Sequence, residues 1–291
     1  MGEKKISWLS WNKASFDKAL NEKKPVLLDI HGVWCHWCHV MDKTTYSNEQ
    51  VIDFVNQNFI PIKVDTDKRP DVNERYNAGG WPTTAILTPK GSVIQAATYV
   101  APEQMIIFLK SSINYFRTNE KELDLNLQKT LQEKTSKTML LNTQDLVENV
   151  VLEAKSSYDQ SFGGFGFEPK FPMPDVLSFL EFYYLHSKDT QVEEILKKTL
   201  TSMAKNGLFD TEEFGFFRYS TTRDWSIPHF EKMLEDNALL LSVYVDAAKL
   251  FGDEIFSGTA KKIIDYLLNN FFDEKEKMFY ASQDADEKYY S

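Results

Sequence analysis

The chain has 291 residues, of which 42% are hydrophobic and 26% charged, an ordinary composition for a globular protein with a large core. This is about twice the usual length of one domain, so two domains are expected. The net charge of -10 argues against a general nucleic-acid binder. The first apolar stretch, after residues 1–5, is too short for a signal peptide, and no run is long enough to span a membrane. We therefore expect a soluble, cytoplasmic protein without nucleic-acid or membrane partners.

The first 117 residues alternate between strand-like and helical patterns. Apolar runs at 25–30 and 60–65 predict buried strands, and 83–88 with 92–99 predict a hairpin across Pro89-Lys90-Gly91. A short strand is expected near Trp8. Helices are expected at 16–21, at 35–45, after an N-cap at Asn48, at about 70–76 and at 105–116. The predicted order is β-α-β-α-β-α-β-β-α.

Residues 118–140 are polar, with no clear core face, and predict a linker or a surface helix. Residues 141–291 predict helices without long strands. These helices are expected at 142–157, 175–187, 191–206, 229–250 and 254–271. Loops rich in glycine and aromatic residues join them, and such repeated helix pairs are typical of an α/α array.

The only two cysteines are Cys35 and Cys38, and this isolated C-x-x-C favours chemistry of the pair. Cys35 falls where a strand gives way to a helix, whose N-terminus favours a thiolate. A protonated His36 would add to this effect. We therefore expect Cys35 to be the low-pKa, more exposed nucleophile, and Cys38, one turn later, to be the resolving thiol. Asp29, a carboxylate in a buried strand, is expected to accept the Cys38 proton.

The cysteine pair has three other interpretations. A zinc site usually needs two further ligands, and His31, His36 and His39 are near, but neighbours within one helical turn rarely converge on one metal. Residues 35–39 also match the C-x-x-C-H pattern of covalent haem, which needs an exported protein. The third interpretation is a pair of buried thiols without a role. Redox chemistry without a metal or cofactor is favoured over these three.

Trp81-Pro82 follows two glycines and precedes a strand, a place where a cis bond is tolerated. A simple turn at the strand entry is the alternative. Together with Trp34 beside the cysteines and Asp29 six residues before Cys35, this pattern resembles a thioredoxin. The resemblance implies that Pro82 is cis, packs against the disulfide and leaves a backbone edge for substrate. The expected substrate-facing or tuning residues are Trp34, His36, Trp37, His39 and Trp81.

Longer motifs resemble a narrower family, the thioredoxin-domain proteins similar to spermatogenesis-associated protein 20. The motifs are Cys35–Met41, Val64-Asp65, Arg69-Pro70-Asp71, Gly79–Pro82, Tyr158-Asp159, Gly163–Gly166, Pro169–Pro172, Arg218–Thr221, Pro228–Leu234 and Asp284-Ala285-Asp286. The resemblance implies an α/β thioredoxin-like domain followed by an all-α region like an (α/α)6 toroid, similar in fold to sugar epimerases and six-hairpin glycosidases. We therefore assign 1–117 to the thioredoxin-like domain and 141–291 to the helical region.

The chain departs from this family in several places. The segment between Arg69 and Gly79 is shorter than usual, which should alter one wall of the cysteine site. The loop before Arg218 has lost glycines. The five predicted helices are too few for six helix pairs, so the toroid is expected to be incomplete. A truncated or split polypeptide would explain this, and so would completion of the array by another copy of the chain.

The helical half carries its own candidate residues. Sugar-handling toroids place aromatic and ionisable groups at the barrel mouth, where acid–base work needs closely spaced proton donors and acceptors. The candidates are Arg218, Tyr219, Asp224, His229 and Glu231, with Asp284 and Asp286 as further members. The favoured alternative is that these charges satisfy loop backbone groups and that the aromatic residues are core. His186, near a predicted helix end, is expected to be a capping or surface residue.

The sequence as a whole favours a thiol–disulfide oxidoreductase acting on a protein disulfide or thiol. His36 between the cysteines is expected to make the pair more oxidising than a Gly-Pro spacer would. Two alternatives remain. One is a carbohydrate-active or epimerase-like protein with an accessory thioredoxin domain and a sugar-like ligand in the helical half. The other is a non-catalytic binding scaffold.

Overall fold

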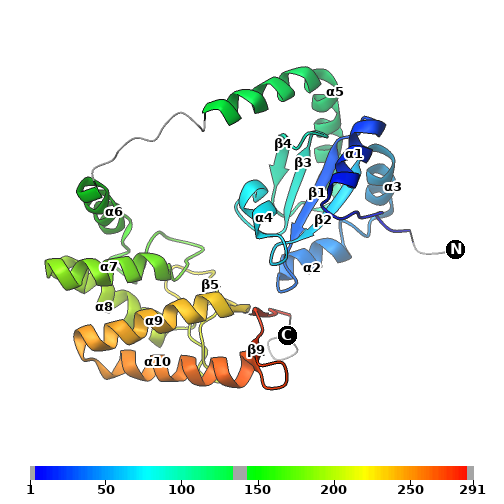
Figure 1. The fold of residues 1–291 in the computed structure, drawn as a ribbon. Coiled ribbons are helices and arrows are strands. Elements are labelled where there is room, and N and C mark those ends of the chain that lie inside the picture. The colour runs from blue at the N-terminus through cyan, green and yellow to red at the C-terminus, as the bar shows by residue number, and fades with distance from the viewer. Residues whose placement is uncertain (1–3, 134–142, 287–291) are drawn as a thin grey trace. The chain divides into compact units, whose positions relative to one another are not determined.

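The computed structural model describes residues 4–133 and 143–286. The chain forms two compact units, residues 1–139 and 140–291, and each is described by itself (Figure 1). Residues 118–133 of the expected linker segment continue the helix α5 (Pro102–Glu133), and the rest of that segment lies outside the described residues. Among the described helices, none is long and apolar enough to cross a membrane.

The N-terminal unit is built on one mixed sheet. Its elements before α5 are α1 (Lys13–Glu22), β1 (Val26–His31), α2 (His36–Lys43), α3 (Glu49–Asn58), β2 (Ile60–Asp65), α4 (Pro70–Tyr76), β3 (Thr83–Leu87) and β4 (Val93–Ala97). The strand order is β2-β1-β3-β4; β1 runs parallel to β2 and antiparallel to β3, which pairs with β4. The short strand predicted near Trp8 is reduced to a single parallel bridge, from Leu9 to Ile62.

Helices cover both faces of this sheet. On one face, Leu27 and Ile86 pack with side chains of α2, α3 and α5; on the other, Leu28 and Ala85 pack with side chains of α1 and α4. Because β1 is central, Val26 to Ile30 are all buried, as its unbroken apolar pattern predicted. Asn48 caps α3 through its side-chain oxygen, which confirms that prediction. The predicted thioredoxin-like fold is confirmed.

The second unit is mainly helical. Its helices are α6 (Thr143–Ser157), α7 (Pro174–Ser187), α8 (Thr190–Lys205), α9 (Leu234–Phe251) and α10 (Glu254–Tyr266), which a π-helical turn, Leu267–Phe271, extends. The helix predicted over 229–250 begins only at Leu234. The residues before it form the short strands β6 (Pro228–His229) and β7 (Lys232–Met233), which pair with β5 (Tyr219–Ser220) and β10 (Ser282–Gln283).

The loops of this unit repeat one kind of hairpin. In the described residues, Tyr158 bridges Phe165, Phe209 bridges Phe216, and β8 (Phe272–Asp273) pairs with β9 (Met278–Phe279). In each hairpin an aspartate follows the first aromatic residue and accepts hydrogen bonds from the amides two and three positions later; these are Asp159, Asp210 and Asp273. The array is therefore a repeat structure, and the predicted class, a partial α/α toroid-like helical region, is confirmed.

Two of these hairpins hold a buried lysine. Lys170 Nζ lies 2.7 Å from Asp159 Oδ2, and Lys232 Nζ lies 2.6 Å from Asp210 Oδ2; both lysine side chains are fully buried. Burial alone would raise the pKa of Asp159, but hydrogen bonds from Arg223, Lys170 and two backbone amides lower it well below its ordinary value. Ion pairs thus connect these loops, and each buried lysine has an aspartate as its partner.

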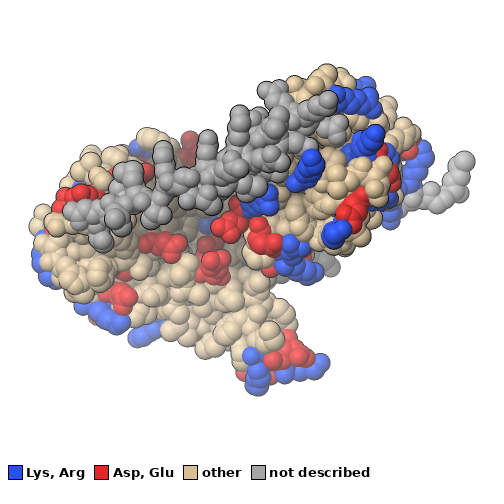
Figure 2. All heavy atoms as spheres, turned by 45° about the horizontal axis from the view of Figure 1, so that its top comes forward, with Lys and Arg blue, Asp and Glu red and all other residues tan. Residues whose placement is uncertain are grey.

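Charged side chains of both signs are distributed over the surface. In the view of Figure 2, Asp and Glu side chains lie interspersed with Lys and Arg side chains, with wide uncharged areas between them. The full chain has 43 acidic and 33 basic residues, so the acidic excess is moderate.

Candidate functional site

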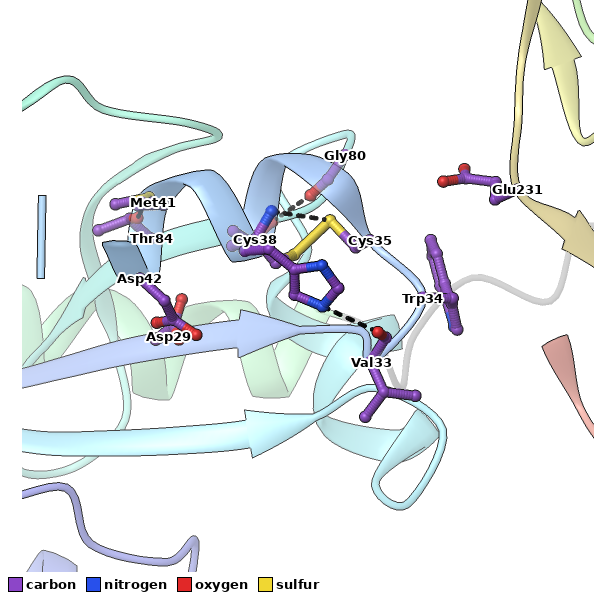
Figure 3. Close-up of a disulfide and its surroundings, with 12 residues drawn as sticks. Asp29, Val33, Trp34, Cys35, Cys38, Met41, Asp42, Gly80, Thr84 and Glu231 are labelled. Atoms are coloured by element: carbon purple, nitrogen blue, oxygen red, sulfur yellow. Dashed lines mark hydrogen bonds between the residues drawn. A yellow bond between two sulfur atoms is a disulfide. The ribbon is translucent and has the colours of Figure 1, made fainter. Parts of the chain in front are cut away.

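Cys35 and Cys38 are joined by a disulfide at the start of α2 (Figure 3). Cys35 is the N-cap of this helix, and its Sγ accepts a hydrogen bond of 3.2 Å from the amide of Cys38. This amide is one of the donors that a helix leaves unpaired at its N-terminus, so it stabilises negative charge on Cys35. The exposed fractions are 4% for Cys35 and 2% for Cys38. Both cysteines are therefore buried in the disulfide form, and Cys35 is only slightly the more exposed of the two.

Tryptophans form the surroundings of the disulfide. Trp34 is buried, donates from Nε1 to Asp67 Oδ2 at 3.1 Å, and contacts the Trp81 ring edge-on at 5.4 Å between centroids. A Cβ atom on Gly32 would lie 2.7 Å from the Trp34 ring, so only glycine leaves room for this packing. Trp37, by contrast, is 46% exposed. Trp34 therefore belongs to the wall of the site, and Trp37 to its outer surface.

The predicted tuning residues are placed around the same loop. The Trp81–Pro82 peptide is cis, as the resemblance to thioredoxin implied, and Pro82 is buried. The His39 ring nitrogen Nε2 lies 2.9 Å from the carbonyl oxygen of Val33, and this contact links α2 to the segment that precedes Cys35. The His36 ring lies edge-on to Trp37 at 5.5 Å. These contacts give both histidines a structural partner beside the disulfide.

Asp29 lies on β1 beneath α2 and is fully buried (Figure 3). Its Oδ2 is 3.3 Å from Lys63 Nζ, and its Oδ1 accepts a bond of 3.5 Å from the Tyr46 hydroxyl. Lys63 also reaches Asp42, at 2.6 Å from Oδ1 and 2.7 Å from Oδ2. Burial raises the pKa of Asp29 to about 6; Lys63 opposes this rise and Asp42 adds to it. Asp29 can therefore exchange a proton near neutral pH.

His31, two residues further along β1, has a shifted pKa as well. Burial lowers the pKa of His31 to about 4, and Lys63 lowers it further, against the opposite effect of Asp42. The imidazole is therefore neutral at pH 7. A neutral histidine at this position adds no charge to the site of Asp29.

In the helical unit, four of the predicted residues lie together. Arg218 Nη1 is 2.7 Å from Glu231 Oε1, and His229 Nδ1 is 3.2 Å from Glu231 Oε2. The Tyr219 ring stacks on the His229 ring at 5.0 Å between centroids, and the Phe171 ring also stacks on the Tyr219 ring, at 4.9 Å. Glu231 is buried, and the Arg218 guanidinium is the cation beside it.

A nearby carboxylate that the sequence did not single out has a raised pKa. Burial raises the pKa of Asp236, in the first turn of α9, to about 6; Arg218 opposes this rise, and Glu235 and Glu231 add to it. The group of Arg218, Tyr219, His229, Glu231 and Asp236 thus combines a cation, aromatic rings and carboxylates.

The remaining candidates of this unit have local roles. Asp224 accepts hydrogen bonds from the amide and hydroxyl of Ser226, and these bonds lower its pKa. Asp284 accepts from the amide of Asp286 in a turn. His186 is exposed, and its Nδ1 lies 2.8 Å from the carbonyl oxygen of Phe182, near the end of α7. His186 is thus the helix-end surface residue that was predicted.

The sequence did not identify the residues that surround Asp29, namely Lys63, Asp42 and Tyr46. One signal was available: Asp42 follows Cys38 by four residues, so both lie on one face of α2. The contact of Lys63 with Asp29 depends on the parallel register of β1 and β2, in which the two residues are paired. No local pattern encodes that register.

Comparisons with known proteins agree with this architecture. Residues 1–139 match a family model described as a protein of unknown function, DUF255. Spermatogenesis-associated protein 20 of Rattus norvegicus is 34% identical over 307 residues, covering 97% of this chain and 39% of that protein. An uncharacterized protein of Caenorhabditis elegans is 35% identical over 304 residues, covering 97% of this chain and 41% of that protein. The chain thus spans about two fifths of the length of these relatives.

Two solved structures also resemble parts of the chain. A DsbH oxidoreductase has a TM-score of 0.35 and 17% identity, covering 38% of this chain and 85% of that one. A cellobiose 2-epimerase from Spirochaeta thermophila has a TM-score of 0.42 and 17% identity, covering 52% of this chain and 42% of that one. At these scores neither structure indicates an activity here. Along 97% of its length, the chain is similar in sequence to spermatogenesis-associated protein 20 and to the uncharacterized protein of Caenorhabditis elegans.

Proposed function

We propose that the protein is a thiol–disulfide oxidoreductase whose reactive pair is Cys35 and Cys38. The observation that supports this proposal most is the Cys35–Cys38 disulfide at the N-terminus of α2, with the buried Asp29 on the strand below. A helix N-terminus stabilises a thiolate, and a carboxyl group with a pKa of about 6 exchanges protons near neutral pH. Both properties serve disulfide exchange.

In the reducing direction, the Cys35 thiolate attacks one sulfur of a substrate disulfide. A Cys35–substrate disulfide forms, and the other substrate sulfur leaves as a thiolate. The Cys38 thiol then gives its proton to the Asp29 carboxylate, and the Cys38 thiolate attacks Cys35 Sγ. The Cys35–Cys38 bond forms while the second substrate sulfur leaves, so two electrons pass from the pair to the substrate. Pro82, which follows a cis peptide bond, and the exposed Trp37 are proposed to contact a protein substrate.

Insulin reduction in the presence of dithiothreitol tests this proposal. The wild type should accelerate it, and Cys35→Ser should abolish the acceleration. In Cys38→Ser the only cysteine left is Cys35, so a mixed disulfide with substrate should accumulate and be visible by mass spectrometry. If Cys35→Ser is as active as the wild type, the proposal is wrong.

His36 is proposed to tune the pair. A positive charge between the cysteines would stabilise the reduced, thiolate form, which makes the pair more oxidising. A measured potential more reducing than thioredoxin's roughly -270 mV would contradict this role.

We also propose a cytoplasmic location, because the chain has no cysteines beyond the redox pair, as is usual where thiols are kept reduced.

The group around Glu231 supports a second candidate, binding of a sugar-like ligand by the helical unit. Stacked aromatic rings suit a sugar face, and the Arg218–Glu231–His229 contacts supply polar groups beside them. Titration of the protein with monosaccharides, followed by NMR, should then perturb Tyr219, and Tyr219→Ala should remove binding while the exposed Tyr280→Ala retains it. No perturbation by any monosaccharide would leave the helical unit as a non-catalytic scaffold.

A further inference from the structure

Lys63 lies between two carboxylates and is closer to the outer one. Its Nζ is 2.6 Å and 2.7 Å from the two oxygens of Asp42, but 3.3 Å from Oδ2 of Asp29. Asp42 lies on α2, one turn after Cys38, and is 42% exposed, whereas Asp29 is 2% exposed (Figure 3). Lys63 thus donates its short, charge-assisted hydrogen bonds to Asp42, the carboxylate that is exposed to water.

We propose that Asp42 is a positioning residue, which holds Lys63 away from Asp29 and thereby lets Asp29 accept and return the Cys38 proton near neutral pH. This role rests on the proposed oxidoreductase function. A lysine that bound Asp29 as closely as it binds Asp42 would stabilise the ionised carboxylate and weaken its affinity for a proton. Asp42 therefore acts on the chemistry through Lys63, without touching substrate.

Other groups around Asp29 stay neutral at pH 7. Tyr46 donates to Asp29, and burial keeps the pKa of this tyrosine well above its ordinary value. The Tyr46 hydroxyl also contacts the Thr84 hydroxyl on β3, which does not titrate. His31 on β1 is neutral because burial lowers its pKa to about 4. The charges that act most on Asp29 are therefore those of Lys63 from β2 and Asp42 from α2.

Two further titratable groups face His31 and complete the surroundings. Asp65 on β2 and His39 on α2 both act on the pKa of His31, Asp65 raising it and His39 lowering it. The charges that act most on Asp29 itself remain those of Lys63 and Asp42, and the variants below leave Asp65 and His39 unchanged.

Asp42→Asn should lower the pH at which Asp29 titrates. The variant removes a negative charge that raises the pKa of Asp29, and it frees Lys63 to move toward the buried carboxylate. Both effects favour the ionised form, so the Asp29 midpoint should fall by roughly one pH unit. Lys63→Met should shift the midpoint in the opposite direction. Asp42→Glu, which keeps the charge, should restore the wild-type midpoint.

The titration of Asp29 can be followed by the ¹³C shift of its carboxyl carbon in the oxidised protein, which needs no substrate. The same variants are then compared for the pH dependence with which Cys38 resolves a mixed disulfide. Asp53→Asn is the matched control: Asp53 also binds a lysine, Lys4, through both oxygens and is 48% exposed, but it lies on α3. It should leave both profiles unchanged.

A lower Asp29 midpoint in Asp42→Asn, with restoration by Asp42→Glu, supports the positioning role. An unchanged or raised midpoint in Asp42→Asn overturns it, because Lys63 would then not be held back by Asp42. Failure of the proposed function is distinguishable: the Asp29 midpoint would still move, but no variant and no wild-type protein would exchange disulfides.

Discussion

Glu181, on α7, is a buried acid whose removal should stabilise the protein at alkaline pH. The side chain is 4% exposed, and its Oε1 has no hydrogen-bond partner within the described part of the chain. Burial raises its pKa from the ordinary 4.5 to about 8, and Asp246 on α9 adds to the rise. The folded protein therefore binds a proton at this site that the unfolded chain releases. Folding stability is unaffected below pH 4.5 and declines as the pH rises toward 8.

The size of this loss follows from the two pKa values. Each pKa unit corresponds to about 1.4 kcal/mol, so complete ionisation above pH 8 costs at most about 5 kcal/mol, and less if the buried site relaxes. Glu181→Gln keeps the size of the side chain and removes the ionisation. The variant should match the wild type near pH 5 and be more stable by a few kcal/mol near pH 9.

Unfolding by denaturant, followed by circular dichroism at several pH values, measures this difference. Hydrogen exchange of peptides from α7 assigns it to the helical unit. Glu153→Gln, at an exposed position of α6, is the control and should follow the wild type at every pH. If the wild type and Glu181→Gln lose stability in parallel as the pH rises, the inferred buried, protonated state of Glu181 is wrong.

Three further predictions concern packing and charge. Gly32→Ala should displace the Trp34 ring, because the added methyl would lie 2.7 Å from it, and tryptophan fluorescence and insulin reduction should both change. Lys170→Met should destabilise the helical unit by about 3 kcal/mol, measured by denaturant unfolding, because it removes one partner of the buried Asp159. Asp29→Asn should slow the attack of Cys38 on the mixed disulfide, because the amide cannot accept the Cys38 proton. It should also abolish the stability loss that the wild type shows as the pH rises through about 6, because the carboxyl with the raised pKa is gone.

Matched substitutions separate these effects from general damage. Gly258→Ala places a methyl where nothing lies within 4 Å, so it should leave Trp34 unchanged. Lys249→Met removes an exposed lysine of an i,i+3 ion pair and should change stability by less than about 1 kcal/mol. Equal effects of Lys170→Met and Lys249→Met would show that the buried pair contributes no more than a surface pair.

Local sequence patterns determined most of the elements. The apolar run 25–30 and its position before the cysteines identified β1, and Asn48 marked the start of α3, because strand periodicity and helix capping depend on neighbouring residues. The Cys35–Cys38 pair was recognisable for the same reason: a spacing of three at a helix start is a local property. Helix ends that depend on distant partners were missed, as at 229–233, where strand pairing with residues 219–220 and 282–283 displaces the helix start to Leu234.

The amino-acid sequence by itself determined that the chain carries a cysteine pair at a helix N-terminus, followed by a helical repeat. Only the tertiary structure decided which groups control Asp29, because Lys63 reaches it through the parallel register of β1 and β2, and Asp42 reaches Lys63 from α2. The structure likewise brought Arg218, His229 and Glu231 together and left Asp224 in its own turn. Electrostatic interactions between side chains depend on distance in space, which separation along the chain does not specify.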